Sequence, residues 1–168
     1  QQPAETITRV VRLPVDELRP RVTPEMLADL GIQELVGEGR SSFAGSASYR
    51  ITNIQAATER MDGVLIAPDE EFSFNTQLGE VDAENGFVEG YAVIGNRTQL
   101  EWGGGICQDS TTVFRAAFWA SLPITERHAH PFYISWYDEF AYGSYGDGPG
   151  MDATIYTGIS DLKFVNDT

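Results

Sequence analysis

The chain has 168 residues, of which 42% are hydrophobic and 21% are charged, and this composition is typical of one folded domain with a sizeable core. Eleven basic residues stand against 25 acidic ones, which gives a formal net charge of −14. A surface of this sign repels nucleic acids and anionic lipid headgroups. No apolar run reaches the length that a membrane span needs. We therefore expect no nucleic-acid partner and no direct membrane contact by this segment.

The N-terminal part is predicted to be separate from the main domain. Residues 5–13 are rich in β-branched side chains and predict a strand, which a proline-rich connector and a short helix ending at Gly31 follow. Residues 37–48 are rich in Gly, Ser and Ala and predict a loop. We place the boundary at its start. Residues 1–36 are then the tail of a preceding module or a linker, and residues 37–168 form the main domain.

The main domain is predicted to contain two longer helices and several short strands. Apolar residues recur at three- and four-residue spacing from Ile51 to Met61, and again over residues 106–122. Gly63 and Pro123 end these two runs. The strand-like segments are residues 64–67, 71–75, 91–94, 97–102, 132–137, 152–157 and 162–165. Residues 91–94 and 97–102 are predicted to form a hairpin, with Gly95 and Asn96 at the bend. The fold class that follows is α+β, with a mostly antiparallel sheet.

The most informative stretch is a run of three glycines that leads into the second helix through Cys107, the one cysteine of the chain. Glycines allow a tight turn or a close approach to a ligand. At a helix start, the unpaired N–H groups and the helix dipole favour a thiolate, and the same N–H groups can hold an oxyanion. Cys107 is therefore a candidate nucleophile at a helix N-terminus, and a packed core thiol is the alternative.

Two histidines follow the cysteine helix, and either could serve as its base. His128 and His130 would face the same side of the strand predicted there. The alternative is a half-exposed strand edge. Asp152, at the start of the next predicted strand, is the candidate for orienting an imidazole, and a turn aspartate is its alternative. Three ligands at these spacings are not a strong zinc signature, so we expect no metal and no cofactor.

A loop rich in aromatic residues follows the histidines. It contains Trp136, Tyr137, Phe140, Tyr142 and Tyr145. Such a loop can wall a groove for sugar or peptide, or it can cover one edge of the core. The sequence pattern alone favours the second role, a hydrophobic cover over one edge of the core.

From about residue 38 to the end, the chain resembles the VanW family, named from a gene of vancomycin-resistance clusters. The matching segments are residues 50–57, 71–75, 103–108, 110–112, 126–130, 150–153 and 161–166. One departure is Asp109, which stands where an apolar residue is commoner. An acid two residues from the thiol is expected to raise the thiol pKa, although helical spacing turns the two side chains in different directions.

The resemblance implies a bacterial envelope protein, mostly anchored and facing outward. Some members of the family are understood as L,D-transpeptidases that use the cysteine to form 3→3 cross-links in peptidoglycan. Carried over, Cys107 becomes the nucleophile, His130 the general base and Asp152 a candidate orienting residue. His128 stays a second catalytic candidate on the residue pattern alone. The residues expected to bind the oxyanion or the substrate are Gly104, Gly105, Ile106, Gln108, Ser110, Thr111 and Arg127.

The expected partner is therefore peptidoglycan, through its stem peptides or its glycan, and the expected state is a monomer. The chain opens at Gln1 without a secretion signal, so we interpret it as a processed chain or a piece of a longer, membrane-anchored or secreted protein. Residues 1–36 resemble the end of a peptidoglycan-binding module that often precedes this domain.

Three functions remain open on the sequence. The first is a cysteine L,D-transpeptidase that forms a thioacyl-enzyme. The second is a module that binds peptidoglycan without chemistry, in which Cys107 is structural. The third is a cysteine amidase or peptidase, which uses the same groups but lets water resolve the acyl-enzyme.

Overall fold

The structure is a computed structural model that describes residues 30–94, 97–143 and 146–167. The chain divides into one unit of Gln1–Glu34 and a second of Leu35–Thr168. The predicted strand at residues 5–13 and the short helix after it lie outside the described residues. Within the described part, no helix is long and apolar enough to cross a membrane. The second unit carries all the elements below.

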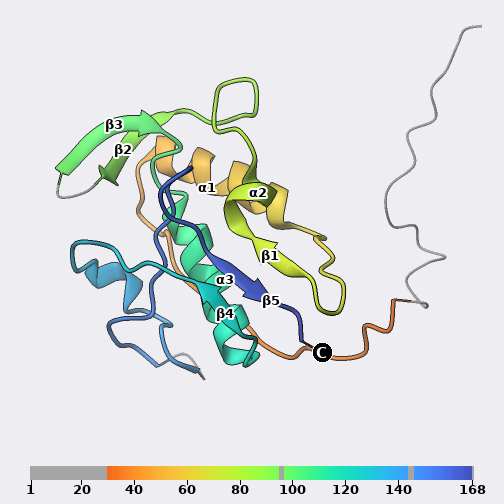
Figure 1. Ribbon diagram of the computed structural model, residues 1–168. Coiled ribbons are helices and arrows are strands. Elements are labelled where there is room, and N and C mark those ends of the chain that lie inside the picture. The colour runs from red at the N-terminus through yellow and green to blue at the C-terminus, as the bar shows by residue number, and fades with distance from the viewer. Residues whose placement is uncertain (1–29, 95–96, 144–145, 168) are drawn as a thin grey trace, which may run out of the picture. The chain divides into compact units, whose positions relative to one another are not determined.

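Both predicted longer helices are present in the second unit (Figure 1). Helix α1 covers Ser48–Met61, and helix α3 covers Cys107–Trp119, somewhat shorter than predicted. Each helix buries one apolar face, through Ile54 and Ala57 in α1 and through Phe114 and Ala117 in α3. The α+β fold class is confirmed.

A three-stranded antiparallel sheet lies against these helices, in the order β1-β5-β4. Its strands are β1 (Glu71–Ser73), β5 (Lys163–Val165) and β4 (Ile124–Glu126). Phe72 pairs with Phe164 across β1 and β5, and their rings stack with centroids 4.8 Å apart. These rings belong to the main core, together with buried side chains of α1 and α3.

A second antiparallel sheet is the predicted hairpin, formed by β2 (Glu89–Ile94) and β3 (Arg97–Trp102). It comes directly before the glycine run and α3, and in Figure 1 it lies beside the N-terminal end of α1. The large apolar side chains Tyr91, Leu100 and Trp102 are exposed on it. The hairpin therefore offers apolar surface near the start of α3 instead of burying it in the core.

Several predicted strands are wrong. Residues 64–67 form no strand, and in residues 71–75 the strand stops at Ser73, where helix α2 (Phe74–Leu78) begins. The Ser73 hydroxyl accepts the N–H of Thr76, and this side-chain cap starts the helix. The other misassigned segments are loops near the start of α3.

Residues 132–137 and 152–157 are those loops. The first contains the 3₁₀ helix η2 (Ser135–Tyr137), and the second has only the isolated bridges His128↔Thr154 and Tyr156↔Ser160. The backbone of residues 152–157 is held partly by side chains: the hydroxyls of Ser110 and Thr111 both donate to the carbonyl of Ala153. Because side chains satisfy these groups, no full strand ladder forms.

Arg115 of α3 holds the loops around Arg40, Tyr137 and Met151 in place through hydrogen bonds. Its side chain extends from α3 and has no exposed surface. The guanidinium donates to the backbone carbonyls of Arg40, Tyr137, Glu139 and Met151. One buried side chain thus links α3 to three separate loop segments, two of which border the candidate site.

Candidate functional site

Cys107 is the first residue of α3, as the sequence predicted. The glycine run before it turns the chain sharply, with φ of 75° at Gly103 and 119° at Gly105, values that favour glycine. Gly104 lies so close to β2 that an added Cβ would come within 2.6 Å of the backbone of Gly90. The loop therefore needs its glycines both for its turn and for its packing.

Asn53 of α1 holds this loop in place. Its side chain is fully buried and donates to the carbonyls of Val88 and Gly104, at 3.0 Å each. Its carbonyl oxygen accepts the N–H of Val88 at 2.8 Å. The amide thus ties α1 to the start of β2 and to the glycine run.

We expect Asn53→Ala to lower the free energy of unfolding by about 3 kcal/mol, because three hydrogen bonds are lost and the carbonyl of Gly104 stays buried without its donor. Urea unfolding followed by circular dichroism measures the change. The control is Thr52→Ala, on the neighbouring exposed position of α1, which should change stability by less than about 0.5 kcal/mol. A similar small change for Asn53→Ala would show that the amide does not hold the loop.

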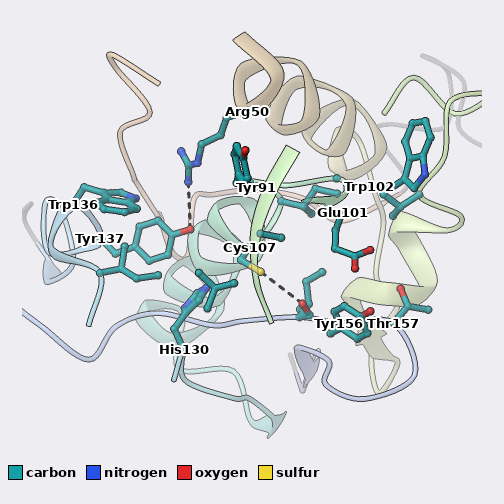
Figure 2. A pocket seen from close by; sticks show the side chains of 18 residues that line it. Arg50, Tyr91, Glu101, Trp102, Cys107, His130, Trp136, Tyr137, Tyr156 and Thr157 are labelled. Carbon is teal, nitrogen blue, oxygen red and sulfur yellow. Dashed lines mark hydrogen bonds between the residues drawn. The ribbon is translucent and has the colours of Figure 1, made fainter. Parts of the chain in front are cut away.

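A cavity of about 400 Å³ opens at the start of α3, and half-buried Cys107 lines it (Figure 2). Its walls come from α1, the β2–β3 hairpin, the glycine run and the two irregular loops. The lining side chains labelled in Figure 2 are Arg50, Tyr91, Glu101, Trp102, Cys107, His130, Trp136, Tyr137, Tyr156 and Thr157. A ligand in this cavity can reach the thiol, which is therefore not sealed in the core.

His130 and Asp152 complete a row of three groups that begins at the thiol. Nδ1 of His130 donates to Oδ2 of Asp152 at 2.6 Å, and the same oxygen accepts the His130 N–H at 2.7 Å. This leaves Nε2 as the ring nitrogen for the thiol, with which the imidazole interacts. The His130 side chain is only 4% exposed, so its orientation is fixed by packing as well as by Asp152.

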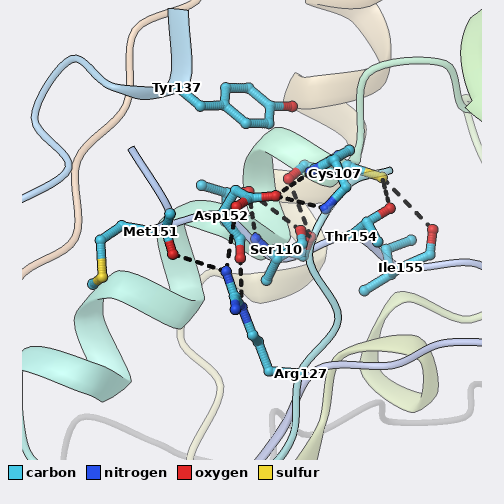
Figure 3. Close-up of polar contacts among 12 residues, drawn as sticks. Cys107, Ser110, Arg127, Tyr137, Met151, Asp152, Thr154 and Ile155 are labelled. Carbon is cyan, nitrogen blue, oxygen red and sulfur yellow. Dashed lines mark hydrogen bonds and ion pairs between the residues drawn. The ribbon is translucent and has the colours of Figure 1, made fainter. Parts of the chain in front are cut away.

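Arg127 supports Asp152 from outside the cavity (Figure 3). Its guanidinium lies 3.2 Å from Oδ1 of Asp152 and donates to the backbone carbonyls of Asp152 and Gly150. The same group lies over the ring of Phe114, 5.1 Å from its centroid. Arg127 was predicted to bind the oxyanion or the substrate, but it does not line the cavity and instead orients Asp152.

The electrostatics of the row favour a charged pair. Burial raises the pKa of the Cys107 thiol, but the hydrogen bond and charge of His130, together with the contacts to Thr154 and Ile155, outweigh burial, so the net pKa is below its ordinary value. Burial lowers the pKa of His130, but Asp152 and Cys107 raise it, to about 9. Both directions favour a thiolate beside an imidazolium at neutral pH.

Other neighbours of the thiol are polar but neutral. Sγ of Cys107 lies 3.4 Å from the Thr154 hydroxyl and 3.6 Å from the carbonyl oxygen of Ile155, contacts drawn in Figure 3. The N–H groups of Gly105 and Cys107 donate to no acceptor within the described parts of the chain. They remain available to a ligand at the start of α3.

His128 lies apart from this row. Its side chain is 47% exposed, and Nε2 is 3.1 Å from Oε1 of Glu126. The prediction that His128 and His130 face one site is wrong, because the segment forms only an isolated bridge at His128 and the alternation of a strand does not apply.

Three of the predicted binding residues also point away from the cavity. Ser110 and Thr111 are buried against Ala153, and Gln108 donates to the hydroxyl of Ser41 on another side of α3. None of the three lines the cavity, so their placement corrects the expectation of ligand contact. Ile106 and Gly105 do line it, although the Ile106 N–H donates to Gly103 and is already occupied.

Asp109 turns from the thiol toward α1. Its Oδ1 accepts the hydroxyl of Thr58 at 2.8 Å, and burial raises its pKa to about 7. It borders a separate cavity of about 210 Å³ and not the one at Cys107. The helical spacing therefore separates the acid from the thiol, as predicted from the sequence.

Several residues that line the cavity carry no functional signal of their own in the sequence, among them Arg50, Tyr91, Glu101, Trp102 and Tyr156. They come from α1, the β2–β3 hairpin and the loop after Thr154, and no local pattern brings these three segments together. For Arg50, the one available signal was its place at the head of a segment that resembles the family. Of the aromatic loop, Trp136 and Tyr137 line the cavity, and Tyr145 lies outside the described residues.

No group of three or more His, Cys, Asp or Glu side chains in the described part of the chain is arranged to hold a metal ion. Cys107 and His130 face each other, but His128 is directed elsewhere. The set that resembled a partial zinc site is therefore not assembled.

Residues 49–168 match the protein family described as VanW like protein. YoaR of Bacillus subtilis (strain 168) is 30% identical over 156 residues, which cover 93% of this chain and 48% of that protein. The vancomycin B-type resistance protein VanW of Enterococcus faecalis (strain ATCC 700802 / V583) is 32% identical over 119 residues, 71% of this chain and 42% of that protein. The chain thus spans less than half the length of each relative. No solved structure matches it significantly.

Proposed function

This chain belongs to the VanW-like protein family, and on that premise we propose that it is a cysteine acyltransferase of the cell wall. The proposed reaction is L,D-transpeptidation, which joins two peptidoglycan stem peptides through a thioacyl-enzyme. The observation that carries the proposal is the row of Cys107, His130 and Asp152, with its thiol at the head of a helix and inside an open cavity.

Acylation begins with the Cys107 thiolate. It attacks the carbonyl carbon of the diamino acid in a stem tetrapeptide, and a C–S bond forms. The His130 imidazolium gives its proton to the nitrogen of the terminal D-Ala as the C–N bond breaks. D-Ala leaves with its amine protonated by His130, and the carbonyl remains on sulfur as a thioester.

The start of α3 supplies stabilisation for the tetrahedral intermediate. The N–H groups of Gly105 and Cys107 are the donors proposed for its oxyanion, aided by the positive end of the helix dipole. Gly105 is essential for this arrangement because its φ of 119° directs the turn.

Deacylation uses the same groups in reverse. A side-chain amine of a second stem peptide attacks the thioester carbonyl and gives a proton to His130, while Cys107 leaves as the thiolate. Asp152 keeps the imidazole in one orientation through both steps, since its Oδ2 accepts the backbone N–H and the Nδ1–H of His130. The product is a 3→3 cross-linked dimer.

The cellular setting is part of the same proposal. One relative carries the name of a vancomycin resistance protein, and an enzyme of peptidoglycan acts outside the cytoplasm. We therefore place this chain at the cell envelope, as one domain of a longer protein that is anchored or secreted.

The test is to incubate the chain with stem tetrapeptides and to identify products by mass spectrometry. We expect 3→3 dimers and released D-Ala with the wild type, and neither with Cys107→Ala. Dimers formed by Cys107→Ala would overturn the assignment of the nucleophile. Hydrolysed stems without dimers would select the amidase or peptidase, and the absence of any turnover would select the binding module.

A further inference from the structure

Arg50 brings a positive charge into the cavity that holds Cys107. It is the third residue of α1, and its side chain lines the cavity from the side opposite His130 in Figure 2. The guanidinium donates to the Ser46 hydroxyl at 3.1 Å and to the Tyr137 hydroxyl at 3.4 Å. These two contacts fix the direction of the side chain without neutralising it, because both partners are uncharged hydroxyls.

Arg50 forms no ion pair in the part of the chain that the structure describes, and its interaction with the buried carboxyl of Asp109 is electrostatic only, without a direct contact. No carboxylate of those residues lies within ion-pair distance of it, whereas Arg127 and Lys163 are paired with Asp152 and Glu126. This stands out in a chain with 25 acidic residues. A half-buried guanidinium that is held by neutral partners and faces a cavity is suited to bind a carboxylate from a ligand.

Arg50 also lies against the loop that supplies the proposed oxyanion donors. A Cβ built at Gly105 would come within 2.7 Å of Cγ of Arg50. The aliphatic part of Arg50 thus packs against the glycine run, and its guanidinium and the Cys107 thiol line the same cavity. In the reaction proposed above, the residue that leaves carries the terminal carboxylate, so this charge enters the cavity together with the attacked carbonyl.

A carboxylate placed on the other side of the cavity, away from Arg50, would meet a negative charge. Glu101 of β3 lines the same cavity, and in Figure 2 Arg50 and Glu101 lie on opposite sides of Cys107. The carboxylate of Glu101 repels the carboxylate of a ligand. The charges thus give the cavity one anion-binding side and one anion-repelling side, which orients a peptide across the thiol.

We infer that Arg50 binds the free terminal carboxylate of the residue that leaves during acylation, so that the site favours a donor peptide with a free carboxylate at its end. This inference rests on the proposed function. The chemical step is unchanged: the thiolate forms the C–S bond, the C–N bond breaks, and His130 protonates the leaving amine, while the carboxylate of the leaving residue stays on Arg50.

The test compares a stem tetrapeptide that ends in a free carboxylate with the same peptide as a C-terminal amide. Acylation of Cys107 is followed by intact-protein mass spectrometry. We expect the wild type to be acylated at least about 10-fold faster by the acid, since a charge-assisted contact is lost in the amide. Arg50→Gln should reduce this ratio to near one, and Arg50→Lys should restore part of it.

Arg60→Gln is the matched control. Arg60 is on the same helix, bonds to Asn85 and does not line the cavity, so the acid-to-amide ratio should not change. If the wild type is acylated equally by acid and amide, the role of Arg50 is wrong while the proposed function stands. If neither peptide acylates Cys107, the proposed function is wrong and this inference with it. The wild-type ratio decides the matter even if Arg50→Gln folds poorly.

Discussion

Replacing His130 by alanine is expected to slow the alkylation of Cys107 by iodoacetamide at pH 7 by at least about 10-fold. The imidazolium lowers the pKa of the thiol through its hydrogen bond and its charge, whereas burial raises it. Without His130, burial still raises the thiol pKa, and only the contacts with Thr154 and Ile155 still lower it. The pKa then moves upward, and less thiolate is present at neutral pH. The pH–rate profile of alkylation measures this shift directly.

His128→Ala is the control for that experiment. His128 is half exposed and contacts Glu126, outside the cavity. Its loss should leave the alkylation profile of Cys107 unchanged. A shift with His128→Ala and none with His130→Ala would mean that the wrong imidazole has been assigned to the thiol.

Replacing Arg115 by methionine is expected to lower the free energy of unfolding by about 4 kcal/mol. The methionine fills similar space but donates to none of the four carbonyls that the guanidinium holds. A buried carbonyl left without a donor, such as that of Tyr137, costs about 1–3 kcal/mol, and the other three cost less because they are only partly buried. The desolvation penalty of the buried charge disappears with Arg115 and offsets part of this loss. Urea unfolding of the variant gives the value.

Arg115→Met should also disturb the geometry of the candidate site. Two of the four carbonyls belong to Tyr137, which lines the cavity, and to Met151, which precedes Asp152. Arg97→Met, on an exposed position of β3, is the control and should change stability by less than about 0.5 kcal/mol. A comparably small effect of Arg115→Met would show that the loops hold their places without it.

The sequence predicted what depends on local pattern. The faces of α1 and α3 follow the spacing of their apolar residues, and the hairpin follows from two strand-like runs around a Gly-Asn bend. The position of Cys107 at a helix start follows from the glycine run before it. The pairing of His130 with Asp152 was also proposed from the sequence, although the strands invoked for it are absent.

The remainder depends on contacts between distant segments. Residues 152–157 have the composition of a strand, but hydroxyls of α3 satisfy part of their backbone, which no local pattern reveals. No local pattern reveals the position of Arg50 either. It reaches the cavity from α1 because Gly105, without a Cβ, lets the helix pack closely on the glycine run. His128 was misassigned because two-residue alternation was applied to a segment that is not a strand.

The central claim is that Cys107 is the nucleophile of an acyl transfer to sulfur. The most direct measurement is intact-protein mass spectrometry of the wild-type chain after brief incubation with a stem tetrapeptide, followed by peptide mapping. We expect a mass increase equal to the tetrapeptide less D-Ala, located on Cys107. An unmodified chain under conditions in which iodoacetamide readily alkylates Cys107 would contradict it.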